Sequence, residues 1–229
     1  MRIDKFLSQM KFCTRKQVNS FLKEHKVVIK QERIISQNYS FNPDNDKVYI
    51  DDKYVYYEDP IHLMMHKPKG YISANKDALY PCVIDLIKDP YDRFDFSIAG
   101  RLDVDTEGLL ILTTDGRLIH EITHPNQHLP KVYEAVLDKV FLHEKDLLEG
   151  VIVNDGNQKP YQAMALKVEK NDYKVWITID EGKFHQVKRM FLSVGYKVLY
   201  LKRIQIGKLK LNDLPLGEVR QIKRSDLFD

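Results

Sequence analysis

Apolar residues at the start of the chain recur every three or four positions, which is the spacing of one face of an α-helix. This pattern predicts a helix over residues 3–10 and a second helix that begins after Thr14, a residue type that often caps helices. The apolar positions of the two helices are Ile3, Phe6, Leu7, Met10, Val18, Phe21 and Leu22. The β-branched run Val27–Ile29 and a second run at 47–50 predict strands, and residues 42–46 are turn formers.

From Ile61 onward the pattern changes, and short strand-like runs outnumber helical ones. We expect strands at 62–66, 95–99, 109–113, 132–137, 163–168, 173–179 and 197–206, and helices at 83–88, 116–123, 144–149 and 185–193. Strands and helices do not alternate regularly, which argues against a doubly wound parallel sheet. The pattern predicts an α+β fold with a mixed, mostly antiparallel β-sheet and flanking helices. The acidic, aromatic stretch at 54–60 marks the boundary between a small domain at 1–58 and a larger one at 59–229.

Composition excludes several classes of protein. With 43% hydrophobic residues among 229, the chain can bury a sizeable core, so it is not disordered or collagen-like. No apolar run reaches the roughly eighteen residues of a spanning helix, and the N-terminus lacks a signal-peptide pattern. Cys13 and Cys82 lie far apart without metal-binding spacing, as expected of buried thiols in a reducing cytosol. We therefore expect a cytoplasmic protein that does not bind membranes.

Positive charge is concentrated in two separate segments of a chain whose net charge is only +3. Residues 1–33 carry a net charge of +6 and residues 181–210 carry +7, whereas residues 34–59 carry −4. Two basic segments on a nearly neutral chain indicate a surface that binds a polyanion such as a nucleic acid. The alternative is that both segments are simply solvated faces.

The string GRLDVDTEGLLILTTDG at 100–116 holds the most concentrated chemistry in the chain. If residues 101–103 are extended, Arg101 and Asp103 point to the same face, because side chains alternate along a strand. A neighbouring arginine favours the ionised carboxylate, and an ionised carboxylate in a pocket is a candidate nucleophile or electrostatic stabiliser. The residues alone leave another interpretation open, in which Asp103 forms a turn and Arg101 is its structural partner.

The same string closely resembles the signature of the pseudouridine synthases, in particular the family typified by the bacterial small-subunit (16S) rRNA enzyme. Further segments, KPKG at 67–70, KVY at 131–133 and EGKFHQVKRM at 181–190, resemble other elements of that family. The resemblance implies that Asp103 is the catalytic aspartate and that Arg101 accompanies it. It also implies that Tyr133 stacks on the target base, and that Lys188 or the adjacent Arg189 pairs with Asp103. Arg101, Tyr133, Lys188 and Arg189 are thus the expected substrate-binding residues.

The N-terminal run RIDKFLSQMKFCTRKQVNSFLKEHKVVI resembles the small αL RNA-binding module first described in a small-subunit ribosomal protein. His25 or Lys26 stands where this module usually has glycine, and Lys30-Gln31 replaces its usual Asn-Gly turn. The resemblance implies that the basic helical face binds RNA, and the residues expected to do so are Lys5, Arg15, Lys16 and Lys23. A helix-turn-helix module that reads DNA is the competing interpretation.

Together the two resemblances imply a site-specific bacterial enzyme that isomerises uridine to pseudouridine in rRNA. Such an isomerisation requires no cofactor or metal, and the chain contains no phosphate-binding loop, dinucleotide fingerprint, HExxH or GxSxG motif. We expect a monomer that acts on 16S rRNA, either free or in a partly assembled small subunit, since no long basic tail follows Phe228. The alternatives are a large-subunit (23S) rRNA pseudouridine synthase and a non-catalytic RNA-binding protein of ribosome assembly.

Overall fold

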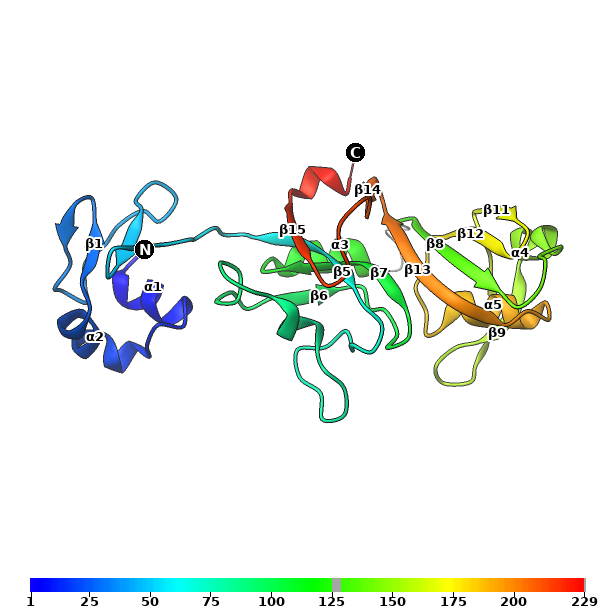
Figure 1. Ribbon diagram of the computed structural model, residues 1–229, viewed down its shortest axis with the longest axis horizontal. Helices are drawn as coiled ribbons and strands as arrows, with labels where there is room; N and C mark the ends of the chain where they lie inside the picture. The colour runs from blue at the N-terminus through cyan, green and yellow to red at the C-terminus, as the bar shows by residue number, and fades with distance from the viewer. Residues whose placement is uncertain (125–128, 229) are drawn as a thin grey trace. The chain divides into compact units, whose positions relative to one another are not determined.

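The computed structural model describes residues 1–124 and 129–228, and the chain divides into two compact units (Figure 1). The first unit consists of Met1–Ile61 together with Ile87–Asp95. The second unit consists of His62–Leu86 and Phe96–Asp229. None of the helices in the described part of the chain combines the length and apolarity needed to cross a bilayer.

The first unit packs two helices on a four-stranded sheet. Helix α1 (Ile3–Gln9) and helix α2 (Val18–Glu24), the latter preceded by the 3₁₀ turn η1 (Arg15–Gln17), lie where the apolar spacing predicts them. Their apolar faces are buried because they share one core with the strands. The sheet order is β2-β1-β3-β4, with β1 Val27–Ile29, β2 Glu32–Arg33, β3 Val48–Ile50 and β4 Lys53–Val55.

The segment Ile87–Asp95 packs on this first core although it lies far along the chain. Phe94 is one of the partly buried residues that cover the core. The guanidinium of Arg93 lies 4.2 Å from the centre of the Phe12 ring, and Lys11 forms an ion pair with Asp95 at 2.8 Å. The first unit therefore includes a loop that lies, in the sequence, between the two stretches of the second unit.

The second unit is built on a nine-stranded sheet in which the main path runs β11-β12-β8-β13-β7-β5-β15. The strands of this path are β5 His62–Lys67, β7 Glu107–Thr113, β8 Lys131–Leu137, β11 Lys167–Asn171, β12 Lys174–Ile179, β13 Val198–Ile206 and β15 Val219–Ile222. Strand β14 (Leu209–Lys210) pairs with β13, and β6 (Ser97–Ala99) pairs with β7. Among the described strands, only the β7–β13 pair is parallel. The predicted α+β fold with a mostly antiparallel sheet is confirmed.

Helices cover this sheet and anchor its loops. Helix α3 (Gly116–Thr123) begins where the Asp115 carboxylate accepts a hydrogen bond from the Arg117 N–H at 2.9 Å, and it buries Leu118 and Ile122. Helix α4 (Glu144–Glu149) lies near β11, and α5 (Gln186–Ser193) packs beside β9 (Figure 1). Strand β9 (Val151–Asn154) forms a hairpin with β10 (Pro160–Ala163). The short 3₁₀ turns are η2 (Val83–Leu86) and η4 (Arg224–Asp226).

Two predicted elements differ from the structure. The strand expected at 163–168 is wrong, because Ala163 ends β10 and β11 begins only at Lys167. Ala163 and Ala165 are both buried, although Ala165 lies in the connection between β10 and β11. The alternating burial therefore comes from a segment that passes from one sheet to the other, not from a single strand. The helix expected at 83–88 is the shorter 3₁₀ turn η2.

The parallel contact between β7 and β13 depends on a glycine. Gly108 lies opposite Arg203 with a φ of 118°, and a Cβ there would fall 2.2 Å from the Arg203 carbonyl oxygen. Any side chain would push the two strands apart, because real Cβ atoms do not approach backbone so closely. Gly108 therefore lets β13 lie against the strand that follows the Asp103 loop.

The two-residue loop between β1 and β2 is strained. Ile29 pairs with Glu32, and the residues between them, Lys30 and Gln31, have φ values of 51° and 67°. A type I′ turn requires positive φ at both central positions, which is why Asn-Gly is favoured there. The loop thus keeps the left-handed geometry of the usual Asn-Gly turn without its residues.

We expect Gln31→Gly to stabilise the protein by roughly 0.5–1 kcal/mol, because relief of the left-handed strain outweighs the greater unfolded-state entropy of glycine. Gln31→Val should destabilise it, because β-branched residues resist positive φ. Thermal unfolding of the full chain would measure both changes. As a control, Asn19→Gly on the exposed face of α2 should lower stability, so a loss at both glycine variants would contradict the strain at Gln31.

Candidate active site

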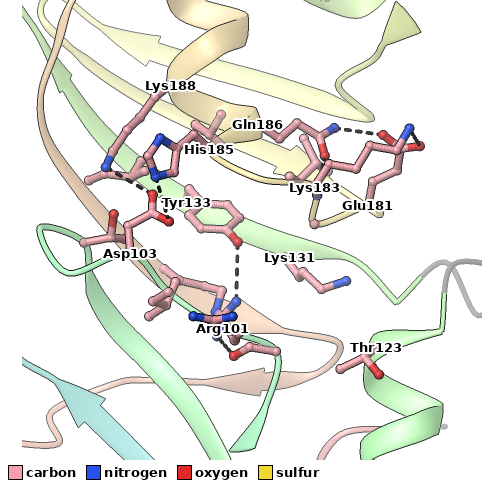
Figure 2. Close-up of a pocket in the computed structure, with 18 of the residues that line it drawn as sticks. Arg101, Asp103, Thr123, Lys131, Tyr133, Glu181, Lys183, His185, Gln186 and Lys188 are labelled. Carbon is pink, nitrogen blue, oxygen red and sulfur yellow. Dashed lines mark hydrogen bonds and ion pairs between the residues drawn. The ribbon is translucent and has the colours of Figure 1, made fainter. Parts of the chain in front are cut away.

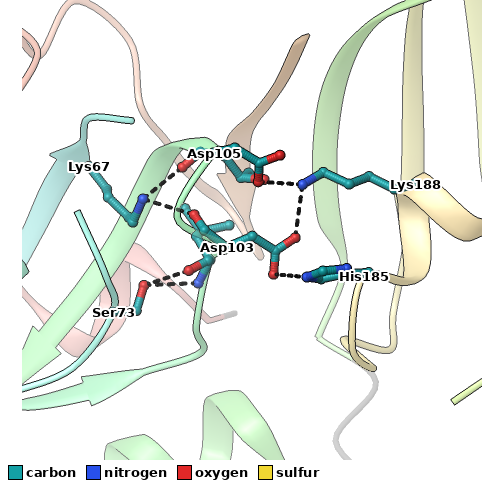
Figure 3. Close-up of polar contacts among 8 residues, drawn as sticks. Lys67, Ser73, Asp103, Asp105, His185 and Lys188 are labelled. Atoms are coloured by element: carbon teal, nitrogen blue, oxygen red, sulfur yellow. Dashed lines mark hydrogen bonds and ion pairs between the residues drawn. The ribbon is translucent and has the colours of Figure 1, made fainter. Parts of the chain in front are cut away.

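The loop between β6 and β7 carries Asp103, and buried polar contacts fix the loop on both sides of it (Figure 3). The Ser73 hydroxyl accepts a hydrogen bond from the Leu102 N–H at 3.0 Å and donates one to the Leu102 carbonyl at 2.9 Å. The fully buried ammonium of Lys67 donates to the carbonyl oxygens of Asp103 and Thr106, both at 2.9 Å. Burial lowers the pKa of Lys67 to about 8. The hydrogen bonds of Ser73 and Lys67 thus fix the backbone of the loop.

The Asp103 carboxylate faces the start of α5 (Figure 3). Its Oδ2 lies 3.2 Å from Lys188 Nζ, and its Oδ1 lies 3.4 Å from His185 Nε2. His185 directly precedes α5 in a left-handed conformation, with a φ of 52°, a strained geometry that is frequent at functional sites. Both carboxylate oxygens therefore have a nitrogen partner from the same short segment.

Lys188 also contacts a second carboxylate, that of Asp105, at 2.5 Å. Burial acts to raise the pKa of Asp105, but the hydrogen bond and charge of Lys188 outweigh it, so the pKa lies below its ordinary value. The Asp105 side chain is 74% exposed, whereas that of Asp103 is 27% exposed. Of the two, Asp103 is thus the carboxylate enclosed by protein.

The structure distinguishes between the two basic residues expected to pair with Asp103. Lys188 forms the pair, whereas Arg189 donates to the Asn154 carbonyl and lies 5.0 Å from the Phe184 ring centre. Neighbouring residues on a helix point about 100° apart, so both cannot face one carboxylate. Arg189 therefore does not pair with Asp103 in this structure, and it borders a separate depression beside β9.

Arg101 lies near Asp103 without pairing with it. Residues 101–103 belong to a loop rather than to a strand, and both Arg101 and Asp103 line the cavity described below. Arg101 is exposed, and within the described residues it forms no ion pair with Asp103. The cationic partner of Asp103 comes from α5 instead.

A cavity of about 440 Å³ opens beside Asp103 (Figure 2). Tyr133, on β8, contributes its nearly buried ring to the cavity wall, together with residues from α3, the end of β12 and the start of α5. Ligand pockets commonly measure about 300–1,000 Å³, so this volume suits a nucleoside. The structure therefore brings Asp103, Tyr133 and Lys188 to one cavity, as expected.

Two further cations at this cavity were not singled out by the sequence. Arg203, on β13, is 2% exposed, and its guanidinium donates to the Tyr133 hydroxyl at 3.4 Å, to the Leu109 carbonyl at 2.8 Å and to the Gly100 carbonyl at 3.2 Å. Lys131 is 7% exposed. Burial, with the charge of Arg203, lowers the pKa of Lys131 to about 8. Lys131 belongs to the KVY segment, but nothing in the sequence separates Arg203 from its solvated neighbours.

Within residues 1–124 and 129–228, no group of three or more His, Cys, Asp or Glu residues is placed to hold a metal ion. Both cysteines are free; Cys82 is buried as expected, whereas Cys13 is only partly buried.

The first unit carries the four predicted RNA-binding cations, Lys5, Arg15, Lys16 and Lys23, all exposed. Among the residues that the structure describes, none of these four forms an ion pair. Other cations of the unit do: the pairs are Arg2–Asp4, Lys11–Asp95, Lys26–Asp52 and Lys30–Asp46. The predicted RNA-binding cations are therefore available to an external anion.

Comparison with known proteins identifies the family. Residues 61–193 match the family model described as RNA pseudouridylate synthase. An uncharacterised RNA pseudouridine synthase of Bacillus subtilis is 38% identical over 231 residues, covering 99% of this chain and 97% of its own. The ribosomal small subunit pseudouridine synthase A of Pasteurella multocida is 36% identical over 239 residues, with 99% and 98% covered. A crystal structure of a pseudouridylate synthase superposes with a TM-score of 0.66 at 35% identity, covering 99% of this chain and 98% of that one. The chain belongs to the RNA pseudouridylate synthase family, and it is an isomerase that acts on RNA.

Proposed function

We propose that this enzyme converts a specific uridine of small-subunit rRNA to pseudouridine, with Asp103 as the catalytic carboxylate. The observation that carries the proposal is the Asp103 carboxylate, which borders a nucleoside-sized cavity and is paired with Lys188 and His185. The small-subunit target is supported by relatives in Pasteurella multocida and Haemophilus influenzae, which are named ribosomal small subunit pseudouridine synthase A and are 36% and 34% identical.

The reaction breaks the N1–C1′ bond of uridine, turns the base, and joins C5 to C1′. The proton lost from C5 is balanced by one gained at N1, so atoms and electrons balance without a second substrate. The site must therefore accept an extruded nucleotide, hold a carboxylate beside its sugar and retain the free base. In this assignment Asp103 supplies the carboxylate, Lys188 orients it, and the Tyr133 ring stacks on uracil.

Base extrusion costs a few kcal/mol, which contacts to the surrounding RNA must offset. Arg101 is exposed at the cavity edge without a protein counter-ion in the described part of the chain, and we assign it to a phosphate of the bound strand. We assign RNA binding to residues 1–58 and catalysis to residues 59–229. The unpaired cations of the first unit, on and between two amphipathic helices, support its assignment as an αL RNA-binding module.

We predict that Asp103→Asn lowers the single-turnover rate of pseudouridine formation by more than about 1,000-fold, as expected when a nucleophilic group is removed. RNA affinity should change little, because the substitution keeps the shape of the side chain. The measurement is the conversion of radiolabelled small-subunit rRNA by excess enzyme, together with a binding assay.

The matched control is Asp105→Asn, which removes the other carboxylate that contacts Lys188. This variant should lose less than about tenfold in rate, because Asp105 is mostly exposed and does not line the cavity. Comparable losses in both variants, or turnover by sequence-verified Asp103→Asn protein, would contradict the assignment of Asp103.

We predict that the double variant Lys16→Gln/Lys23→Gln binds rRNA more weakly and with a shallower salt dependence. The slope of log affinity against log salt should fall in magnitude by roughly 0.7–0.9 for each phosphate that the protein no longer neutralises. Lys11→Gln/Lys26→Gln is the matched control, because these lysines are paired with Asp95 and Asp52. Equal slopes for the two double variants would show that the unpaired cations do not bind RNA.

The target is tested by mapping pseudouridine in both rRNAs from cells with and without this protein. The proposal predicts that one small-subunit position loses its pseudouridine and regains it when the wild-type gene is restored, but not with Asp103→Asn. Loss of a large-subunit position instead would overturn the target while preserving the activity. An unchanged map with altered ribosome assembly would favour an RNA-binding role without catalysis.

A further inference from the structure

We propose that Lys131 and Arg203 form a positively charged site that stabilises the uracil anion released when the N1–C1′ bond breaks. The proposal rests on the proposed function, because it takes the cavity beside Asp103 as the uridine site. It assigns a role to two buried cations that the arrangement of Asp103, Lys188 and Tyr133 does not require.

Lys131 and Arg203 are both nearly buried, and both line the cavity. Lys131 Nζ donates to the carbonyl oxygens of Leu129 and Asp180, at 2.8 and 3.2 Å. The partners of Arg203 are likewise neutral: two carbonyl oxygens and the Tyr133 hydroxyl. In the part of the chain that the structure describes, neither cation forms a close ion pair with a carboxylate, and the charge of Asp180, which acts to raise the pKa of Lys131, is outweighed by burial and by Arg203.

This arrangement is unusual for buried charge, which is normally paired because an isolated ion loses its hydration. The carbonyl contacts do not require a full positive charge, since a neutral amide side chain also donates hydrogen bonds. Arginine side chains are not deprotonated in proteins, so this residue type supplies a permanent positive charge. The two cations also oppose each other, as the charge of Arg203 contributes to the lowered pKa of Lys131. An anion that enters the cavity would compensate both the lost hydration of the two cations and the repulsion between them.

The reaction produces such an anion. When the N1–C1′ bond breaks, its electron pair stays on uracil, while C1′ becomes electron-deficient and is compensated by the nearby carboxylate. Uracil remains anionic until C5 bonds to C1′ and the C5 proton is replaced by one at N1. Fixed positive charge in a site shielded from water stabilises such developing charge with little reorganisation. The position of Arg203, against the hydroxyl of the stacking Tyr133, places that charge at the wall assigned to the base.

An RNA phosphate is the competing anion, and the structure favours it less. Phosphates are bound at the surface, where the cavity already offers the exposed Arg101. Arg203 and Lys131 lie deeper, with exposures of 2% and 7%. The depth of the two cations suits a planar base rather than the charged backbone of a strand.

The test varies the leaving group. A fluorine at C5 of the target uridine withdraws electrons and makes the uracil anion less basic, so its departure needs less stabilisation. Single-turnover consumption of rRNA containing uridine or 5-fluorouridine at the target would be followed by nuclease digestion and mass spectrometry. The enzymes compared are wild type, Lys131→Met, Lys131→Arg and Arg203→Gln. Lys183→Met is the control, because it removes a charge from the same cavity that is already paired with Glu181.

We expect Lys131→Met to slow the uridine substrate by about 10²-fold, the scale for loss of one preorganised charged donor. The 5-fluorouridine substrate should be slowed about tenfold or less, so the ratio of the two rates rises by about tenfold. Arg203→Gln should raise the ratio in the same way, and Lys131→Arg should restore the wild-type ratio. A merely structural role for the two residues would slow both substrates equally.

An unchanged ratio in both Lys131→Met and Arg203→Gln overturns the proposal. If the ratio is unchanged while the salt dependence of RNA binding becomes shallower, the anion is a phosphate. Thermal unfolding shows whether Lys131→Met or Arg203→Gln fails to fold. If one of them does, the rate ratio of the other variant tests the proposal. Failure of the proposed function is separable, because it would appear as turnover by Asp103→Asn whatever the ratio in these variants.

Discussion

The position of Asp103 depends on a buried ammonium group that forms no close ion pair with any residue that the structure describes. Lys67, the last residue of β5, binds the carbonyl oxygens of Asp103 and Thr106 and so fixes the loop that precedes β7. A buried charge loses much hydration, and the lowered pKa of Lys67 reflects this cost. The carbonyl dipoles and the nearby carboxylates compensate it. The backbone of the loop is therefore set by the sheet beneath it, and only the carboxylate remains for α5 to orient.

The site joins two halves of one sheet. Asp103 follows β6 and precedes β7, whereas Lys188 lies on α5, which packs on β9 and β13. These halves meet at the short parallel contact between β7 and β13, where Gly108 lies against the Arg203 backbone. The Arg203 side chain then ties Leu109 and Gly100 of one half to Tyr133 of the other. The separation between the Asp103 carboxylate and the Tyr133 ring is thus determined where the two halves of the sheet meet.

The sequence predicts those parts of the molecule that local pattern determines. The helices of the first unit and most strands of the second lie where apolar spacing placed them, because each buries one face. The motifs also place Asp103, Tyr133 and Lys188 at one cavity. Spacing could not decide between Lys188 and Arg189, since that choice depends on how α5 is rotated against the sheet. Nor could it reveal the buried state of Arg203, which depends on the pairing of β13 with β7 and on a side-chain hydrogen bond to the Leu109 carbonyl, 94 residues away in the sequence. The misplaced strand at 163–168 has the same cause, since burial at a crossing between sheets imitates alternation.

The distribution of ion pairs separates cations that have a carboxylate partner in the fold from the cations that we propose bind the ligand. In the first unit, Lys11, Lys26 and Lys30 pair with aspartates, whereas Lys16 and Lys23 have no such partner among the described residues. At the cavity the cations differ in their depth. Water solvates the charge of an exposed, unpaired arginine, whereas an unpaired cation buried in the cavity wall needs a nearby anion to offset its lost hydration. A charge count over the sequence treats these groups alike. Their physical roles differ because an exposed cation attracts RNA over the Debye length, whereas a buried one acts only on charge that enters the cavity.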